Sequence, residues 1–237
     1  MSSHHSLIST GNDELDSRLG GGLPHPSLTV IEGDNGTGKT TIALQFTYGA
    51  LGQGRRVIYL TTESTVRQLL MQARNITFNL TPYYLRKSLE VYSAHTRPEE
   101  WTREWAQRIL ASLSRFLASK RGQVDLIVID SLTPIASRLK ASELALLFSV
   151  MRSVTRYGTS VLVTIHPGAV GEELMKVARA VADVYFKLGV VEVGGRPVKV
   201  LSVVKIRGAP TVTETAIAFD VDPAFGIKIV PIVLAHA

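Results

Sequence analysis

Short, continuous apolar runs alternate along the chain with longer segments in which apolar residues recur every three or four positions. Continuous runs are typical of buried parallel strands, and the longer period is typical of the helices that cover them. The predicted strands are 27–32, 57–61, 89–93, 124–129 and 160–165. The predicted helices are 40–51, 66–74, 98–120, 142–157 and 172–182. This order predicts an α/β fold with a mainly parallel central sheet flanked by helices.

The segment 98–120 carries an apolar stripe with a spacing of four residues. It consists of Trp101, Trp105, Ile109, Leu113 and Leu117. Residues at this spacing share one face of a helix. Such a stripe usually packs against a core, so we expect it to cover the sheet.

After Asp183 the pattern changes to shorter alternations that predict strands at 184–193, 197–206, 214–220 and 227–232. Gly194-Gly195 is a turn signal between the first two of them. We therefore expect a C-terminal antiparallel β meander over 184–232. The entry segment 1–26 shows no periodicity, and one domain over 1–237 is the simplest interpretation.

Composition restricts the function classes. Hydrophobic residues make up 45% of the chain and there is no cysteine, which excludes disulfides, thiol catalysis and cysteine-ligated zinc. No apolar run approaches the roughly 20 residues that span a bilayer, and no signal peptide is evident. A cytoplasmic protein is expected. His4 and His5 are assigned no function.

The formal net charge is +6. Such a balance is compatible with nucleic acid, anionic lipid or an acidic protein partner, and equally with a basic surface that only aids solubility.

The most specific motif runs from Gly33 to Thr40 and matches G-x-x-x-x-G-K-[ST], with a strand before it and a helix after it. Its glycines let backbone N–H groups surround phosphates, the lysine reaches the β- and γ-phosphates, and the last hydroxyl ligates Mg²⁺. The sequence therefore predicts binding of ATP (or ADP) with Mg²⁺. The candidate nucleotide-binding residues are Gly33, Asp34, Asn35, Gly36, Thr37, Gly38, Lys39, Thr40 and Thr41.

A carboxylate ends the apolar run Leu126-Ile127-Val128-Ile129-Asp130. This is the Walker B arrangement of P-loop NTPases, in which the acid holds Mg²⁺. Asp130 and Thr40 are thus the predicted metal residues. Asp125, at the other end of the run, is interpreted as a solvated terminus.

Hydrolysis needs a group that orients water. Glu63 is the candidate because it follows the strand 57–61 at the carboxyl edge, where ligands bind in such sheets. The alternative is a carboxylate that only supports the start of the helix 66–74. Thr61 and Thr62 could contact the same water. Thr164 and His166 end a later strand at the same edge and could sense the γ-phosphate, although His166-Pro167 could also be only a structured turn.

Two segments at the start of the chain carry a family resemblance. Residues 8–16 (Ile-Ser-Thr-Gly-Asn-Asp-Glu-Leu-Asp) and 19–24 (Leu-Gly-Gly-Gly-Leu-Pro) resemble the entry motif of RecA/RadA/KaiC-type ATPases. Within that superfamily the P-loop and the segments 59–63, 129–133 and 164–167 resemble the FlaH (ArlH) family of the archaellum motor. The resemblance covers about residues 7–232.

This resemblance implies a RecA/KaiC-like fold, ATP and Mg²⁺ binding, and assembly into a ring, expected to be a hexamer. It also implies docking on the motor ATPase and on the polytopic membrane platform protein, hence a place at the cytoplasmic face of the cell membrane. Lys205 and Arg207 are similar to the K-x-R finger that reaches the γ-phosphate of the adjacent subunit in KaiC-type rings. Together with Glu63 and Lys39 they are the candidate catalytic residues. Two solvated charges on an edge strand are the alternative for Lys205 and Arg207.

The sequence departs from KaiC in carrying one ATPase domain and in having Thr62-Glu63 where KaiC has two adjacent glutamates. A nucleotide switch with slow or no hydrolysis is therefore favoured over a fast ATPase. A RadA-like recombinase paralogue acting on DNA is the alternative. The connection from His166 to Gly171 is too short for the long mobile loop with which recombinases touch DNA, so nucleic acid is not the expected partner.

Overall fold

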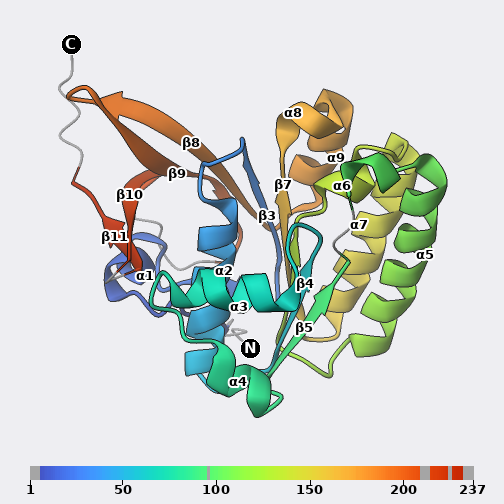
Figure 1. Ribbon diagram of the computed structural model, residues 1–237, viewed down its shortest axis with the longest axis horizontal. Coiled ribbons are helices and arrows are strands. Elements are labelled where there is room, and N and C mark those ends of the chain that lie inside the picture. Colours follow the sequence, from blue (N-terminus) through green and yellow to red (C-terminus); the bar gives the residue numbers. More distant parts are fainter. Residues whose placement is uncertain (1–5, 95–96, 209–213, 224–225, 232–237) are drawn as a thin grey trace.

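A nine-stranded sheet forms the centre of the protein (Figure 1). The computed structural model describes residues 6–94, 97–208, 214–223 and 226–231, so His4, His5 and Ile232 lie outside the described residues. The strand order is β11-β10-β9-β8-β3-β7-β6-β4-β5. The strands are β3 (Leu28–Gly33), β4 (Val57–Thr61), β5 (Leu89–Ser93), β6 (Leu126–Asp130), β7 (Ser160–Ile165), β8 (Val184–Val193), β9 (Arg196–Ile206), β10 (Ala216–Asp222) and β11 (Gly226–Ile229).

The sheet has a parallel part and an antiparallel part. Strands β3 to β7 pair in parallel, and β8 joins them by pairing in parallel with β3. From β8 onward the neighbours β8–β9, β9–β10 and β10–β11 are antiparallel. The prediction of a mainly parallel sheet followed by an antiparallel meander is therefore confirmed.

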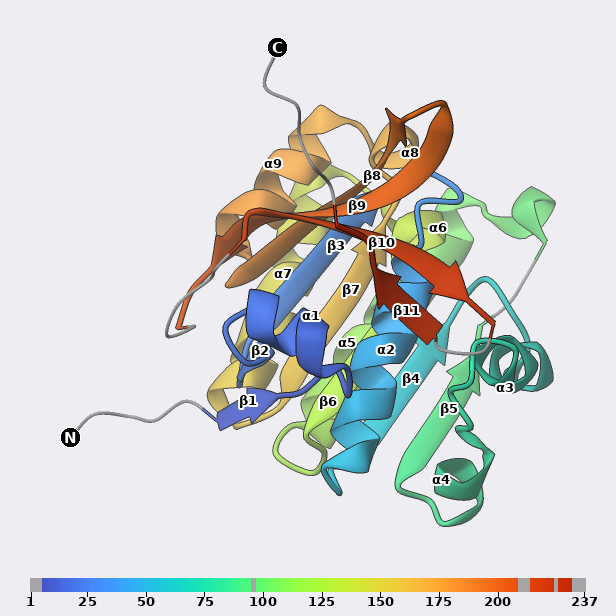
Figure 2. The same ribbon diagram turned by 90° about the vertical axis from the view of Figure 1, so that its left-hand side faces the viewer.

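Helices cover both faces of the sheet (Figure 1), which explains the continuous apolar runs of the central strands. Helices α2 (Lys39–Gly52) and α3 (Val66–Arg74) lie on one face with the short α4 (Thr81–Leu85), as Figure 2 shows. The other face is covered by α5 (Arg103–Lys120), α7 (Ala141–Arg156) and α9 (Glu172–Val181), joined by the short α6 (Thr133–Ala136) and α8 (Pro167–Val170). Each face has its own cluster of buried apolar side chains.

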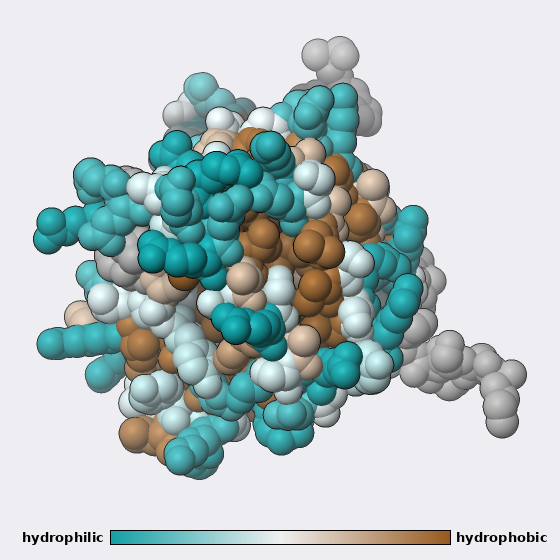
Figure 3. Space-filling model, turned by 90° about the vertical axis from the view of Figure 1, so that its right-hand side faces the viewer, coloured by the Kyte–Doolittle hydropathy of each residue, from teal (hydrophilic) through white to brown (hydrophobic). Residues whose placement is uncertain are grey.

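The outer surface of the α5–α7 layer is shown in Figure 3, where a band of hydrophobic residues lies between hydrophilic ones. Leu146 on α7 is 63% exposed. Among the described residues, none of the helices combines the length and apolarity needed to cross a membrane.

The structure corrects the start of one predicted helix. The helix predicted from Pro98 begins only at Arg103, because Thr102 caps it by accepting a hydrogen bond from the backbone N–H of Trp105. Residues Pro98–Glu100 form a 3₁₀ turn, so Trp101 lies outside the helical stripe. The remaining stripe residues pack toward the sheet, with Leu113 and Leu117 buried.

The entry segment shows no sequence periodicity, yet it contains regular structure. It contains β1 (Ser6–Ile8), α1 (Asp13–Arg18) and β2 (Leu23–His25), with β1 and β2 paired antiparallel. Its backbone crosses α2 at Gly49, where an added Cβ would lie 2.1 Å from the carbonyl oxygen of Ser9. The side chain of Gln45 fixes the crossing by donating to the carbonyl of Thr10 at 2.5 Å. The residues in these contacts lie far apart in sequence, so no local sequence pattern predicts them.

The parallel strands end at a common edge of the sheet. Thr61 and Asp130 are register partners at the ends of β4 and β6, and Glu32 and Ile165 are partners near the ends of β3 and β7. The segments that carry the predicted chemistry follow these ends directly, so the topology gathers them in one place.

Candidate nucleotide-binding site

The loop from Gly33 to Thr40 joins β3 to α2 in a tight turn. Gly36 and Gly38 have φ angles of +79° and +97°, a region that residues with side chains rarely adopt. At Gly33 an added Cβ would lie 2.5 Å from the hydroxyl oxygen of Thr37. That hydroxyl donates to the carbonyl of Asp34 at 2.8 Å and so closes the loop from inside.

The N-terminus of α2 faces this loop. Gly38 is the N-cap residue, and no side chain caps the first amides of the helix. Uncapped amides and the positive end of the helix dipole form a binding site for anions. The loop and the helix thus present the backbone donors that a phosphate group requires.

A cavity of about 370 Å³ opens beside the loop. It is lined by Asn35, Gly36, Gly38, Lys39, Thr40, Thr41, Glu63, Gln72, Lys199 and Val221. Six of the predicted loop residues therefore border it, whereas Gly33, Asp34 and Thr37 shape the loop without lining the cavity. The Lys39 ammonium donates to the carbonyl of Asp34 at 3.0 Å. Burial lowers the pKa of Lys39, and the nearby carboxylates of Glu63 and Asp130 oppose that shift.

Asp130 is the buried acid of the site, only 2% exposed at the end of β6. Tyr59 donates to Oδ2 at 2.8 Å and Thr164 donates to Oδ1 at 2.6 Å. Thr40 also hydrogen-bonds this carboxylate. Burial raises the pKa of Asp130, and the hydrogen bonds from Thr164, Tyr59 and Thr40 work against that shift. The predicted metal residues Thr40 and Asp130 are therefore direct neighbours.

These residues fit a magnesium ion that is shared with phosphate. The part of the chain that the structure describes has no group of three or more His, Asp or Glu side chains able to hold a metal by themselves. Mg²⁺ typically takes one or two protein oxygens and completes its shell with water and substrate phosphates. One hydroxyl and one carboxylate beside a phosphate-binding loop match that donor set. Asp125 lies at the other end of β6, where it accepts from the backbone N–H of Arg56 at 2.8 Å.

Glu63 borders the cavity opposite the loop and is exposed. The helix that follows is capped by Thr65, whose hydroxyl and Gln68 form a capping box, so Glu63 is not its N-cap. The hydroxyl of Thr61 accepts from the backbone N–H groups of Glu63 and Ser64, at 3.3 and 3.2 Å. Thr62 donates to the carbonyl of Ser131 at 2.8 Å. The Thr61 hydroxyl therefore binds the backbone of Glu63, and the Thr62 hydroxyl binds the backbone of Ser131 after β6.

His166 lies beside the loop and does not line the cavity. Its Nδ1 is 3.3 Å from Oδ1 of Asp34, at ion-pair distance but not in hydrogen-bonding geometry. Its backbone N–H donates to the hydroxyl of Thr133 at 2.9 Å and begins α8. The residue thus belongs to a structured turn and also touches the loop through Asp34.

Lys205 and Arg207 lie toward the amino-terminal end of the parallel strands, opposite the end from which the loop emerges. Lys205 pairs with Tyr185 near the start of β8, whereas Gly33 pairs with Leu188 farther along that strand. The Lys205 ammonium donates to the carbonyls of Ala182 and Arg179 at the end of α9. Burial and the neighbouring Arg207 lower the pKa of Lys205. Arg207 is exposed just beyond β9. Neither residue reaches the loop of its own chain.

Three residues of the cavity were missed by sequence reasoning: Gln72 on α3, Lys199 on β9 and Val221 on β10. The C-terminal strands bring Lys199 and Phe219 over the loop, since an added Cβ at Gly38 would lie 3.3 Å from the Phe219 ring and 3.5 Å from Cδ of Lys199. The alternation of apolar and polar residues in β9 predicted a strand, but it did not predict where that strand lies in the sheet. No local signal in the sequence marked these residues.

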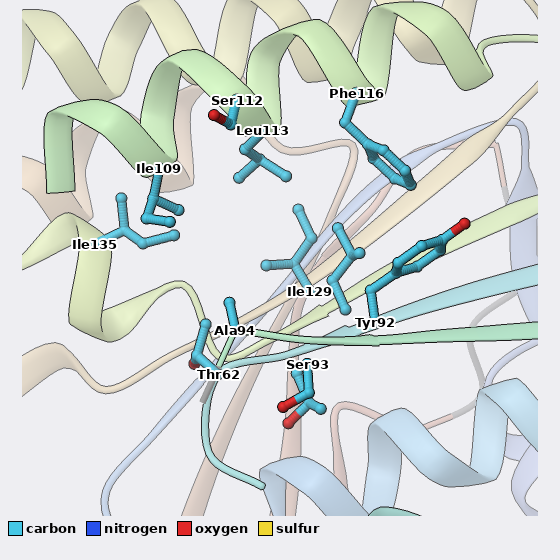
Figure 4. Close-up of a pocket in the computed structure, with 12 residues that line it drawn as sticks. Thr62, Tyr92, Ser93, Ala94, Ile109, Ser112, Leu113, Phe116, Ile129 and Ile135 are labelled. Atoms are coloured by element: carbon cyan, nitrogen blue, oxygen red, sulfur yellow. The ribbon is translucent and has the colours of Figure 1, made fainter. Parts of the chain in front are cut away.

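A second cavity, of about 270 Å³, lies between α5 and the ends of β4, β5 and β6 (Figure 4). Ile109, Leu113 and Phe116 point from α5 toward Tyr92 and Ile129 on the strands, and the rings of Tyr92 and Phe116 are 5.2 Å apart. No residue of its lining carries a charge. A triphosphate therefore fits the cavity beside Lys39 and not this apolar one.

Comparison with known proteins agrees with this geometry. The family model of the KaiC ATPases matches residues 8–233. The archaeal flagellar ATP-binding protein FlaH of Sulfolobus acidocaldarius is 40% identical over 231 residues, which cover 98% of this chain and 100% of that protein.

Two solved structures share the fold. FlaH from Methanocaldococcus jannaschii superimposes with a TM-score of 0.83 at 22% identity, over 96% of this chain and 100% of that one. A KaiC-like protein from Pyrococcus horikoshii gives a TM-score of 0.75 at 21% identity with the same coverage.

Proposed function

Because the chain belongs to the KaiC ATPases, and within them to the FlaH group, we propose that it binds ATP with Mg²⁺ and acts as a nucleotide-dependent switch in the archaellum motor. The observation that carries the proposal is the contact of Thr40 with the buried carboxylate of Asp130, beside Lys39 at the start of α2. Hydrolysis is slow or absent in this proposal, and the nucleotide state is the signal.

The loop amides and Lys39 bind the phosphates in this proposal, while Thr40 and Asp130 hold Mg²⁺. The ion supplies neutralisation of phosphate charge. Tyr59 and Thr164 keep the Asp130 carboxylate in one orientation, at 2.8 and 2.6 Å. Glu63 orients water, its position set by Thr61. A single exposed carboxylate is a weak base for this task, which supports slow turnover.

A ring is proposed because the two candidate finger cations lie away from the loop of their own chain. Lys205 and Arg207 lie at the edge of the sheet opposite the loop, as their pairing along β8 requires. A head-to-tail ring brings that edge of one subunit against the loop edge of the next. The pair would then stabilise phosphate charge in the neighbour's site. A hexamer that docks on the motor ATPase and the membrane platform, at the cytoplasmic face of the membrane, is the assembly we propose.

Size-exclusion chromatography with light scattering tests the switch. Wild-type protein should change from small species to a ring when ATP and Mg²⁺ are added. Lys39→Ala should stay small under both conditions, and Lys176→Ala, an exposed lysine on α9, should behave like the wild type. A Lys39→Ala variant that has lost ATP binding but forms the ring and binds both partners normally would show that the switch hypothesis is wrong.

A further inference from the structure

The stretch from Ser64 to Leu89 contains cations but no carboxylate. Its charged residues are Arg67, Arg74, Arg86 and Lys87, so the stretch carries four positive charges. It forms α3, α4 and their connection, which lie beside the edge strand β5 (Figure 2). All four cations are exposed. Glu63 and Glu90 flank this stretch, and within it every charged side chain is positive.

The same stretch exposes large apolar side chains. Met71 is 54% exposed, Tyr84 38% and Leu85 73%. The backbone beneath them is firmly packed, because Leu69 and Phe78 are buried in the core. Met71, Tyr84 and Leu85 are thus held on the surface by a rigid frame.

Between α3 and α4 lies a groove of about 420 Å³, which we call the α3–α4 groove. Leu70, Met71 and Tyr84 supply apolar walls, and Arg67 and Arg74 border it. A concave apolar site with cations at its border suits an inserted apolar side chain flanked by carboxylates.

Helix α3 joins this groove to the nucleotide cavity. Met71 lines the groove, and the next residue, Gln72, lines the cavity. The helix begins at Val66, three residues after Glu63, another cavity residue. A small shift of α3 on nucleotide binding would therefore change the shape of the groove.

We propose that the α3–α4 groove binds an acidic amphipathic segment of a partner protein, and that nucleotide in the neighbouring cavity changes its affinity. The second half rests on the proposed nucleotide switch. Binding of a second copy of this chain in the groove is a different outcome, which the self-association measurement below detects. A membrane surface is a poor match, because a concave groove presents its apolar walls inward.

A fluorescence-anisotropy titration tests the proposal on the full chain. The probe is a labelled helical peptide of about five turns with leucines along one face and glutamates on the other. A comparison peptide carries lysine in place of every glutamate. The glutamate peptide should bind and the lysine peptide should not. The double variant Arg67→Glu with Arg74→Glu should bind the glutamate peptide at least about tenfold more weakly than the wild type. It should bind the lysine peptide more tightly.

Arg108→Glu with Arg115→Glu is the matched control, since both arginines are exposed on α5. It should leave the affinity for the glutamate peptide unchanged. Equal binding of both peptides, or unchanged binding in the Arg67/Arg74 variant, would overturn the proposal. Two further results for the Arg67/Arg74 variant would overturn the proposal. Loss of binding to phosphatidylglycerol vesicles alone would point to a membrane as the occupant, and loss of self-association alone would point to a second copy of this chain.

Each titration is repeated with ATP and Mg²⁺, and ATP affinity is measured separately. A changed peptide affinity supports the coupling. An unchanged peptide affinity in protein that binds ATP overturns the coupling. Failure to bind ATP, with peptide binding intact, would instead count against the proposed function and leave the groove assignment supported.

Discussion

The hydroxyl of Thr164, near the end of β7, donates a 2.6 Å hydrogen bond to Oδ1 of Asp130 at the end of β6. The two residues are 34 positions apart in sequence, and only the pairing of β6 with β7 brings them together. The bond leaves Asp130 oriented toward Thr40, which also contacts its carboxylate. Strand pairing thus connects Thr164, one of the two residues that could sense the γ-phosphate, to the predicted metal ligand.

Asp130→Asn should separate metal binding from stability. The variant should lose Mg²⁺-dependent ATP affinity, because an amide is a poor ligand for a hard cation. It should also unfold at a temperature about 2–4 °C higher in the absence of nucleotide, corresponding to about 1 kcal/mol, because the buried charge is removed. Asp125→Asn, at the other end of the same strand, should keep the ATP affinity. Calorimetric titration and thermal unfolding measure both effects, and a destabilised Asp130→Asn would contradict the second.

The pH dependence of stability follows from the same carboxyl group. Burial raises the pKa of Asp130 in the folded state, so between the unfolded value of 3.8 and the folded value the native state holds a proton that the unfolded state has lost. Stability contributed by this group is therefore full below pH 3.8 and falls as pH rises through the folded pKa. Denaturant titrations across this pH range should show that the free energy of unfolding falls less in Asp130→Asn than in the wild type. Equal slopes would mean that Asp130 does not titrate in this range.

Glu63→Gln should affect hydrolysis and not binding. Glu63 lines the cavity, and its role in the proposal is to orient water. We expect ATP affinity within about twofold of wild type and any measurable ATPase rate lowered at least about 100-fold. Glu173→Gln, an exposed glutamate on α9, is the control. A turnover that survives Glu63→Gln would remove this residue from the catalytic set.

Lys205 and Arg207 should differ in their effects on folding. Lys205 caps the end of α9 through two carbonyls, so Lys205→Met should cost about 1 kcal/mol of unfolding free energy. Arg207 is exposed, and Arg207→Ala should change stability by less than about 0.5 kcal/mol. Chemical denaturation measures both. A stable Lys205→Met would show that its carbonyl contacts contribute little.

Mixing variants tests whether Arg207 acts on a neighbour. A ring of Arg207→Ala and Lys39→Ala subunits contains interfaces with an intact loop on one side and an intact Arg207 on the other. Such mixtures should regain nucleotide turnover or ring stability that each variant lacks alone. Absence of any recovery in mixed rings of verified composition would contradict action between subunits.

Two glycines of α2 provide a matched test of the entry segment. At Gly49 an added Cβ would lie 2.1 Å from the carbonyl oxygen of Ser9, whereas at Gly52 nothing lies within 4 Å. Gly49→Ala should therefore destabilise the protein by about 1–3 kcal/mol. Gly52→Ala should be neutral or stabilising by up to about 1 kcal/mol. Thermal unfolding and limited proteolysis near residue 9 measure the difference, and equal effects would show that the crossing adapts.

Single-stranded DNA should bind weakly. The alternative recombinase function rests on the net charge of +6 and on no feature of the site. We expect no binding at micromolar protein and physiological salt. A micromolar affinity with a steep salt dependence would revive that alternative.

The sequence by itself determined the succession of strands and helices along the chain and the chemistry of the phosphate-binding loop. Continuous apolar runs predicted buried strands, and the P-loop motif predicted the turn that the glycines at 36 and 38 make. These features depend only on neighbouring residues: the spacing of apolar residues, the glycines of the turn and one carboxylate at the end of an apolar strand. The family resemblance extended them to the fold.

Tertiary structure decided the rest, since it depends on which distant segments meet. Only the sheet order placed Thr164 against Asp130 and placed Lys205 at the edge away from the loop. Only the C-terminal strands brought Lys199 over the nucleotide cavity. The entry segment shows no periodicity of its own, and its backbone packs closely against Gly49 of α2. Contacts between segments far apart in the chain depend on backbone pairing and close packing, and a one-dimensional pattern does not encode them residue by residue.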